Sequence, residues 1–140
     1  ITKKNPLKKS PFFSLTLRKK LCRKLIKRHK KIQFNYYEDK LKSKTSIALV
    51  KFLKKRHKYK IFFIIGSDNL INFHKWKNYK ELLKLSILVV FSRKGFDTKA
   101  KKSVIMRNLK NKNIKFLKNL KIDISSTRLR SKIINGSKKN

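Results

Sequence analysis

The sequence predicts an α/β fold, a Rossmann-like parallel sheet with helices on both faces. Two five-residue apolar runs, Ile61–Ile65 and Ile87–Phe91, are typical of strands that are buried on both faces. Segments with apolar residues three and four positions apart lie before, between and after these runs, as expected of amphipathic helices. Such alternation of helix and strand indicates a parallel sheet whose crossovers are helical.

The first half of the chain predicts a helix, a strand and a second helix. Apolar residues at helical spacing predict a helix over Leu15–Arg28, and Ser14 can cap its first turn. Alternation of apolar or aromatic residues with polar ones predicts a strand over Ile32–Tyr37. A polar loop at Glu38–Lys44 then leads to a helix over Ser46–Lys55.

The second half predicts three more helices around the buried strands. A helix is expected over Trp76–Leu85, and a loop at Arg93–Asp97 leads into another helix over Thr98–Leu109. A weaker strand region at Ile114–Ile124 and a closing helix at Ser126–Ile134 complete the pattern. We expect one domain over residues 1–140, since domains typically have about 100–150 residues.

Composition excludes several classes of protein. Hydrophobic residues make up 39% of the chain, which is too many for a disordered basic tail. Apolar runs of five residues are far shorter than the about 20 that a membrane span needs, so we expect no membrane span. The single cysteine, Cys22, excludes an internal disulfide, and the three histidines lack the spacing of metal ligands. A reducing compartment such as the cytoplasm fits this composition.

The charge allows two interpretations. The chain has 42 Lys and Arg against 6 Asp and Glu, a formal net charge of +36. Such a surface attracts polyanions, either through non-specific binding or because a nucleic acid is a specific partner of the protein. Alternatively, a vocabulary rich in Lys, Ile and Asn reflects composition bias, with Lys at every solvated position. Basic clusters occur along the whole chain, whereas a nucleic-acid site concentrates its charge on one face, and this favours composition bias.

Ligands of open parallel sheets bind beyond the carboxyl ends of the strands, where two loops are candidates. One loop opens the closing helix with three hydroxyl residues and an arginine on the same face. The free N–H groups of a helix N-terminus suit a phosphate, and an arginine can bind it bidentately. The alternative is an ordinary helix cap with a solvated arginine. These residues are Ser125, Ser126, Thr127 and Arg130.

The other loop follows the first buried strand and holds Gly66 and Asp68. Glycine there permits close approach of a ligand, and a carboxylate at a strand end can accept from a ribose hydroxyl or bind a metal. A helix cap is the structural alternative for Asp68. Trp76 follows this loop and can stack on a planar heterocycle, or it belongs to the core as a single tryptophan usually does.

Taken together, four segments resemble the nicotinate-nucleotide adenylyltransferases, in the order and at about the spacing of that family. These segments are Asn5–Lys8, Ile64–Leu70, Phe73–Trp76 and Ile124–Arg130. The resemblance implies a nucleotidyltransferase of NAD biosynthesis with a Rossmann-like fold. It would transfer AMP from ATP to nicotinate mononucleotide with Mg²⁺, giving nicotinate adenine dinucleotide and pyrophosphate.

The resemblance also implies roles for individual residues. ATP phosphates would bind the serines, threonine and arginine of the loop before the closing helix. Gly66 and Asp68 would contact the nucleotide, and Trp76 would stack on the nicotinate ring. Further substrate contacts are expected from Thr45 or Ser46, from Lys8, and from Arg93, which matches the arginine of the family's Arg-Pro-Gly loop although a lysine replaces the proline.

One family feature has no match in this sequence. The family begins with a strand–helix unit carrying a Gly-x-Phe-Asp-Pro-x-His-x-Gly-His loop, which stabilises the transferring phosphate. We therefore expect the amino-terminal strand–helix unit to be missing, no catalytic residue of that loop to be present, and the chain as it stands to be incomplete and inactive. Oligomeric state, and the preference between nicotinate and nicotinamide mononucleotide, are left open.

A second hypothesis of another class is a basic RNA-binding or ribosome-associated protein. The high positive charge supports this hypothesis. Buried strands and four ordered motifs have no reason to occur in an RNA-binding protein. Salt separates the hypotheses, because affinity for RNA falls steeply with salt concentration whereas nucleotide binding to an enzyme depends on it weakly.

Overall fold

The computed structural model of the chain describes residues 1–3, 10–108, 113–118 and 131. The chain divides into two compact units, Ile1–Leu49 and Val50–Asn140. Helix α3 (Ser46–Arg56) begins in the first unit and continues into the second. The single domain expected from the sequence stays a prediction.

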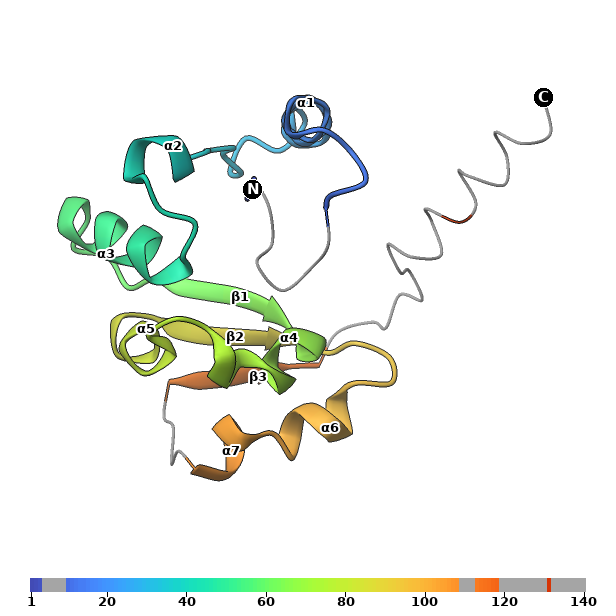
Figure 1. Ribbon diagram of the computed structural model, residues 1–140, viewed down its shortest axis with the longest axis vertical. Coiled ribbons are helices and arrows are strands. Elements are labelled where there is room, and N and C mark those ends of the chain that lie inside the picture. Colours follow the sequence, from blue (N-terminus) through green and yellow to red (C-terminus); the bar gives the residue numbers. More distant parts are fainter. Residues whose placement is uncertain (4–9, 109–112, 119–130, 132–140) are drawn as a thin grey trace. The chain divides into compact units, whose positions relative to one another are not determined.

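The second unit is built on a parallel sheet of three strands (Figure 1). The strands are β1 (Phe62–Gly66), β2 (Ile87–Phe91) and β3 (Ile114–Leu117), in the order β1-β2-β3. Both strands predicted from apolar runs are confirmed to within one residue. The burial on both faces expected of the first strand is wrong, because Phe62 and Ile64 on one face of β1 are 53% and 64% exposed. The third prediction, Ile114–Ile124, is confirmed over its first four residues, and residues 119–124 lie outside the described part of the chain.

Both connections between the strands are helical. The first contains α4 (Ser67–Ile71), η1 (Phe73–Lys75) and α5 (Tyr79–Leu85), and the second contains α6 (Asp97–Lys101) and α7 (Val104–Asn108). Helix α4 contacts α6 and α7, so the two connections pack on each other over one face of the sheet. The predicted Rossmann-like parallel α/β arrangement is thereby confirmed.

Two predicted helices differ in extent from those observed. Helix α5 begins at Tyr79 rather than Trp76, because Asn78 has a left-handed backbone conformation that a helix interior excludes. The helix predicted over Thr98–Leu109 is two short helices, α6 and α7, which are interrupted at Lys102 and the buried Ser103. The spacing of apolar residues does not reveal a break between two helices, because the apolar positions on either side of the break still face the core.

The core of the second unit lies between the sheet and these helices. Leu88 and Val90 of the central strand are fully buried, as are Leu70 and Phe73 from the first connection. Ile105 of α7, 1% exposed, adds the second connection to the same core. Burial of each such side chain contributes about 1.5–3 kcal/mol to stability, so this core fixes where the two connections leave the sheet.

The first unit contains α1 (Leu15–Ile26) and α2 (Glu38–Leu41). The Oγ atom of Ser14 accepts a hydrogen bond of 3.2 Å from the backbone N–H of Leu17, which confirms the predicted cap. Helix α2 occupies the start of the segment expected to be a loop, Glu38–Lys44.

The strand predicted over Ile32–Tyr37 is wrong, because these residues form no ladder. The described part of the first unit contains no strand that could pair with them. Their alternating aromatic rings instead face cations of α1: Lys19 Nζ lies 3.7 Å from the ring centre of Tyr36, and the Arg23 guanidinium 5.3 Å from that of Phe34. The aromatic residues that alternate with polar ones, Phe34 and Tyr36, therefore make cation–π contacts rather than a strand.

In the ranges that the structure describes, we find no helix with the length and apolar character needed to cross a membrane.

Candidate active site

The carboxyl ends of β1 and β2 bring two loops together. Gly66 ends β1, and Ser67 begins α4 directly after it. Arg93 lies two residues beyond the end of β2, and Asp97 begins α6. Because β1 and β2 are parallel neighbours in register, their carboxyl ends meet at one edge of the sheet, where open α/β sheets bind their ligands.

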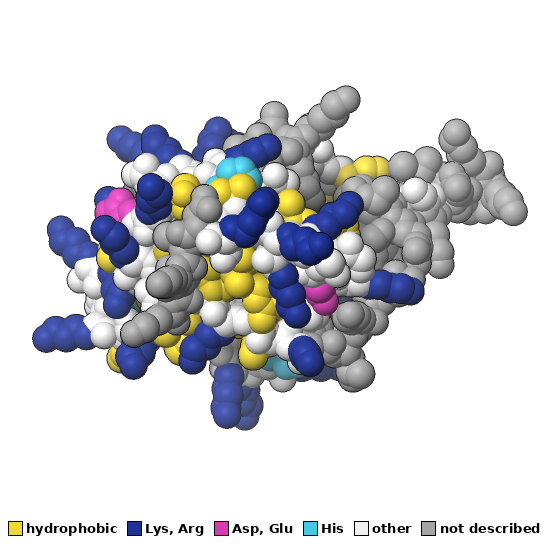
Figure 2. Space-filling view, turned by 90° about the horizontal axis from the view of Figure 1, so that it is seen from below, with side chains coloured by type: hydrophobic (Ala, Val, Ile, Leu, Met, Phe, Trp, Pro, Cys, Tyr) yellow, Lys and Arg dark blue, Asp and Glu magenta, His cyan; other side chains and the backbone are white. Residues whose placement is uncertain are grey.

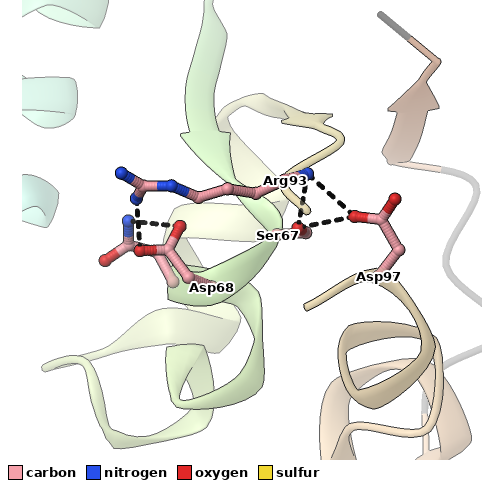
Figure 3. A network of polar contacts seen from close by, with 5 residues as sticks. Ser67, Asp68, Arg93 and Asp97 are labelled. Carbon is pink, nitrogen blue, oxygen red and sulfur yellow. Dashed lines mark hydrogen bonds and ion pairs between the residues drawn. The ribbon is translucent and has the colours of Figure 1, made fainter. Parts of the chain in front are cut away.

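Asp68 and Arg93 form an ion pair at this edge (Figure 3). The Nη1 atom of Arg93 lies 2.7 Å from the Oδ2 atom of Asp68. The Asp68 side chain is 24% exposed and that of Arg93 is 41% exposed, so both charged ends can be reached from solvent. Two residues that the sequence singled out separately, 25 positions apart, are thus in contact.

A second network fixes the backbone beneath this ion pair (Figure 3). The hydroxyl of Ser67 donates a hydrogen bond of 2.7 Å to Asp97 Oδ1. The backbone N–H of Arg93 donates to the same Oδ1 atom at 2.9 Å and to Ser67 Oγ at 3.0 Å. Ser67 is fully buried, so these bonds satisfy a hydroxyl that has no access to water.

Gly66 is required by the space that Asp68 occupies. A Cβ atom at position 66 would lie 2.5 Å from Asp68 Oδ1 and 3.9 Å from Arg93 Cδ. Gly66 has φ −84° and ψ 158°, which any residue adopts, so the backbone does not itself demand glycine. The absence of a side chain lets the Asp68 carboxylate fold back over β1 toward Arg93.

Trp76 belongs to an aromatic cluster of the first connection. Its ring centre lies 5.0 Å from that of Phe73 and 6.1 Å from that of Phe63, to which it is perpendicular. Phe73 also contacts Tyr79 edge-on. Phe73 is fully buried while Trp76 is partly exposed, so Trp76 combines the two alternatives considered for it: it packs on the core and keeps part of its surface accessible.

Thr45 and Ser46 lie in the first unit, at the start of α3. The Thr45 Oγ1 atom accepts from the Ala48 N–H at 3.4 Å and lies 3.0 Å from Ser43 Oγ, which makes Thr45 a helix cap. Both residues also line a cavity of about 90 Å³ together with Glu38 and other first-unit residues. One carboxylate oxygen of Glu38 is buried there without a hydrogen-bond partner.

Five predicted site residues lie outside the described part of the chain. Lys8 falls within residues 4–9, and the predicted phosphate-binding residues fall within residues 119–130. Their roles stay predictions. These residues are Lys8, Ser125, Ser126, Thr127 and Arg130.

Two residues of the network, Ser67 and Asp97, were not singled out from the sequence. Asp97 met the criterion that selected Asp68, because it is one of only 6 acids and follows a buried strand within a few residues. Ser67 carried no signal of its own, since a serine after a strand is common. Their connection depends on β1 and β2 being neighbours, which the sequence pattern does not specify.

The described residues offer no cage for a metal ion. Among them, no three His, Cys, Asp or Glu side chains lie close enough together to bind one. Asp68 is paired with a guanidinium, and one oxygen of Asp97 accepts two hydrogen bonds. Both carboxylates are therefore committed to protein partners.

On one face of the molecule, the described basic side chains do not gather into one patch. On the face seen in Figure 2, Lys and Arg side chains are scattered between hydrophobic ones. A nucleic-acid interface concentrates cations along one surface, and the described residues of this face show no such concentration.

Comparison with known proteins connects this chain to nucleotidyltransferases. The family model described as cytidylyltransferase-like matches residues 1–132. Several curated relatives share the name "Probable nicotinate-nucleotide adenylyltransferase". The relative from Pelagibacter ubique is 40% identical over 130 residues, which are 93% of this chain and 72% of the relative.

Two further relatives give similar values. The protein from Fusobacterium nucleatum is 41% identical over 123 residues, 84% of this chain and 61% of the relative. The protein from Aquifex aeolicus is 33% identical over 127 residues, 87% of this chain and 76% of the relative. The chain thus spans between 61% and 76% of the length of these three relatives.

Proposed function

The chain belongs to the cytidylyltransferase-like family, among the nicotinate-nucleotide adenylyltransferases, and on that premise we propose that it serves adenylyl transfer from ATP to nicotinate mononucleotide. The products are nicotinate adenine dinucleotide and pyrophosphate, in a cytoplasmic step of NAD biosynthesis. The observation that carries the proposal is the ion pair of Asp68 and Arg93, which joins two family motifs at the ligand-binding edge of the sheet.

The chemistry asks for positioning and charge stabilisation. A phosphate oxygen of the mononucleotide attacks the α-phosphorus of ATP in line, a new P–O bond forms, and the bond to the departing pyrophosphate breaks. No covalent enzyme intermediate is needed. Catalysis then depends on holding both phosphates in line and on cations that stabilise the developing charge.

We assign the pyridine nucleotide to the edge beyond β1 and β2. Asp68 would accept hydrogen bonds from a ribose hydroxyl, and Arg93 would donate to the phosphate, since a guanidinium suits phosphate oxygens. The exposed part of the Trp76 ring would stack on the pyridine ring. Thr45 and Ser46 line the first-unit cavity, and they are candidates for substrate contact by the resemblance to the family alone.

We assign the ATP phosphates to the hydroxyl-rich loop before the closing helix that the sequence predicts, and to an arginine that the spacing would place on the same face of that helix. A helix N-terminus with free N–H groups, three hydroxyl groups and a guanidinium is a suitable phosphate site. This assignment rests on the resemblance of the motif to the family and on its spacing. The residues are Ser125, Ser126, Thr127 and Arg130.

A divalent cation, Mg²⁺, is proposed to enter with ATP. Mg²⁺ is usually held by one or two carboxylates together with substrate phosphates, rather than by a protein cage. The carboxylates described at this edge already have protein partners. None of them is therefore assigned as a ligand of the cation.

The test is an assay of the complete gene product with ATP and either mononucleotide, measuring pyrophosphate release. We expect Arg93→Ala to raise the KM for nicotinate mononucleotide about 10- to 100-fold, the range for one charge-assisted hydrogen bond. Trp76→Ala is expected to raise it about tenfold through lost stacking, and Trp76→Phe to restore most of the affinity. Arg130→Ala should instead raise the KM for ATP.

The matched control is Glu81→Ala. Glu81 pairs with Lys51 at 2.7 Å in the second unit, on side chains that are 40% and 52% exposed. Its removal should leave both KM values unchanged. No pyrophosphate release with either mononucleotide, combined with RNA binding that weakens steeply with salt, would reject the enzyme in favour of the nucleic-acid hypothesis.

A further inference from the structure

We propose that Ser67 and Asp97 are positioning residues, which fix the backbone at Arg93 so that its guanidinium reaches Asp68 and the substrate. The inference rests on the function proposed for this edge of the sheet. Neither side chain is assigned a contact with substrate. Each acts through the hydrogen bonds that it makes with the protein.

Burial restricts the Ser67 side chain. Ser67 is 0% exposed, and its hydroxyl donates to Asp97 Oδ1 while accepting from the Arg93 N–H. A buried hydroxyl that lost either partner would be left unsatisfied, at a substantial cost in stability. Ser67 is therefore fixed in one rotamer. The backbone of Asp68, the next residue in the chain, is held in place with it.

Asp97 provides one acceptor atom for two hydrogen bonds. Asp97 Oδ1 receives hydrogen bonds from both the Ser67 hydroxyl and the Arg93 N–H, at 2.7 and 2.9 Å. These bonds join the loop after β1 to the loop after β2 at the point where both leave the sheet. Hydrogen bonds to a carboxylate are roughly twice as strong as those between neutral groups. These two bonds therefore hold the two loops firmly together.

The backbone and the side chain of Arg93 have different partners. Its backbone N–H is held by the network, whereas its side chain is 41% exposed and its Nη1 atom is bound by Asp68. An arginine with a fixed base and an accessible tip is already oriented when a phosphate arrives, which reduces the entropy lost on binding. The geometry thus points to preorganisation of Arg93 as the contribution of Ser67 and Asp97.

The test compares four variants of the complete gene product: Asp97→Ala, Asp97→Asn, Arg93→Ala and the double variant Asp97→Ala with Arg93→Ala. We expect Asp97→Ala to raise the KM for nicotinate mononucleotide about tenfold with a smaller change in kcat. Asp97→Asn retains an oxygen that accepts both hydrogen bonds and should restore most of the affinity. The double variant should be no worse than Arg93→Ala alone, because Asp97 acts through Arg93.

Ser67→Ala provides a milder variant in case Asp97→Ala does not fold. It removes the hydroxyl and leaves the bond between Asp97 and the Arg93 N–H in place, so we expect a rise in KM of about threefold. Hydrogen exchange of the Arg93 amide gives a readout that is independent of turnover. This exchange should become faster in Asp97→Ala and remain unchanged in the control Glu81→Ala.

The outcomes separate the inference from the proposed function. If Arg93→Ala raises KM while Asp97→Ala and Ser67→Ala do not, the positioning role is rejected and the proposed function stands. Additive effects of Asp97→Ala and Arg93→Ala would also reject it, since Asp97 would then act elsewhere. If neither the parent protein nor any variant forms product from ATP and either mononucleotide, the proposed function itself fails.

Discussion

At the scale of single residues, Gly66 shows how the site depends on a side chain that is absent. The Oδ1 atom of Asp68 lies 2.5 Å from the position that a Cβ atom of residue 66 would occupy. The end of an aspartate side chain can rotate away, so alanine would fit here only by displacing that carboxylate. Because the φ of Gly66 is −84°, the backbone would accept the change.

We therefore expect Gly66→Ala to impair substrate binding more than stability. The KM for nicotinate mononucleotide should rise about tenfold, equivalent to about 1.4 kcal/mol of binding free energy. The midpoint of urea unfolding should change little. In an Asp68→Ala background the clash disappears, so Gly66→Ala should add nothing to the KM. An equal effect in both backgrounds would show that the displaced carboxylate is not the cause.

Residue types at strand ends made part of this site predictable. Gly66 and Asp68 could be selected because they follow an apolar run, and Arg93 because its loop resembles a loop of the family. Asp68 and Arg93 do meet at this edge. Ser67 and Asp97 could not be selected with the same force, because their importance arises from hydrogen bonds between two loops. A sequence pattern identifies side chains with suitable chemistry, but it does not state which backbone N–H they will bind.

At the scale of elements, the turn after β2 places both Arg93 and Asp97. The Phe96 N–H donates to the Arg93 carbonyl at 3.0 Å, and Gly95 between them has a φ of +81°. A turn with positive φ at its third position requires glycine or, less favourably, asparagine. This turn reverses the chain so that α6 can start at Asp97, beside the backbone of Arg93.

Replacement of Gly95 should consequently weaken the element rather than create a clash. Among the described residues, and apart from its two neighbours in the chain, no atom lies within 4 Å of a Cβ built at this position. The backbone conformation is therefore what opposes a side chain here. We expect Gly95→Ala to lower the free energy of unfolding by about 1–2 kcal/mol, measured by urea denaturation. Gly95→Asn, which adopts the left-handed region more readily, should cost less. Equal losses for both variants would contradict this explanation.

The same scale shows why one predicted strand failed. Ile61–Ile65 and Ile87–Phe91 are continuously apolar and were correctly predicted as strands, and each pairs with a parallel neighbour. Phe62 and Ile64 of the first strand are nevertheless 53% and 64% exposed, so this strand is covered on one face only. Ile32–Tyr37 has the alternation of a strand but, in the described part of its unit, no neighbouring strand to pair with. Its aromatic rings face Lys19 and Arg23 instead. Alternation reports two unlike faces, and a ladder needs a partner as well.

At the scale of the whole molecule, the dominant physical feature is a net charge of +36 on 140 residues. The described ion pairs, Lys51 with Glu81 and Arg93 with Asp68, involve few of the 42 basic residues. Self-repulsion at such a charge destabilises the compact state, and salt screens it. Stability should therefore depend on ionic strength more than in a protein with balanced charges.

We expect the midpoint of thermal unfolding to rise by several degrees, on the order of 5 °C, between about 0.02 M and 0.5 M sodium chloride. The Debye length falls over this range from about 20 Å to about 4 Å, so repulsion between neighbouring lysines is progressively removed. Sucrose at matched osmolality is the control, since it does not screen charge. A midpoint that saturates at micromolar polyphosphate would instead indicate a specific polyanion site, because uniform screening by a simple salt has no saturation point at such concentrations.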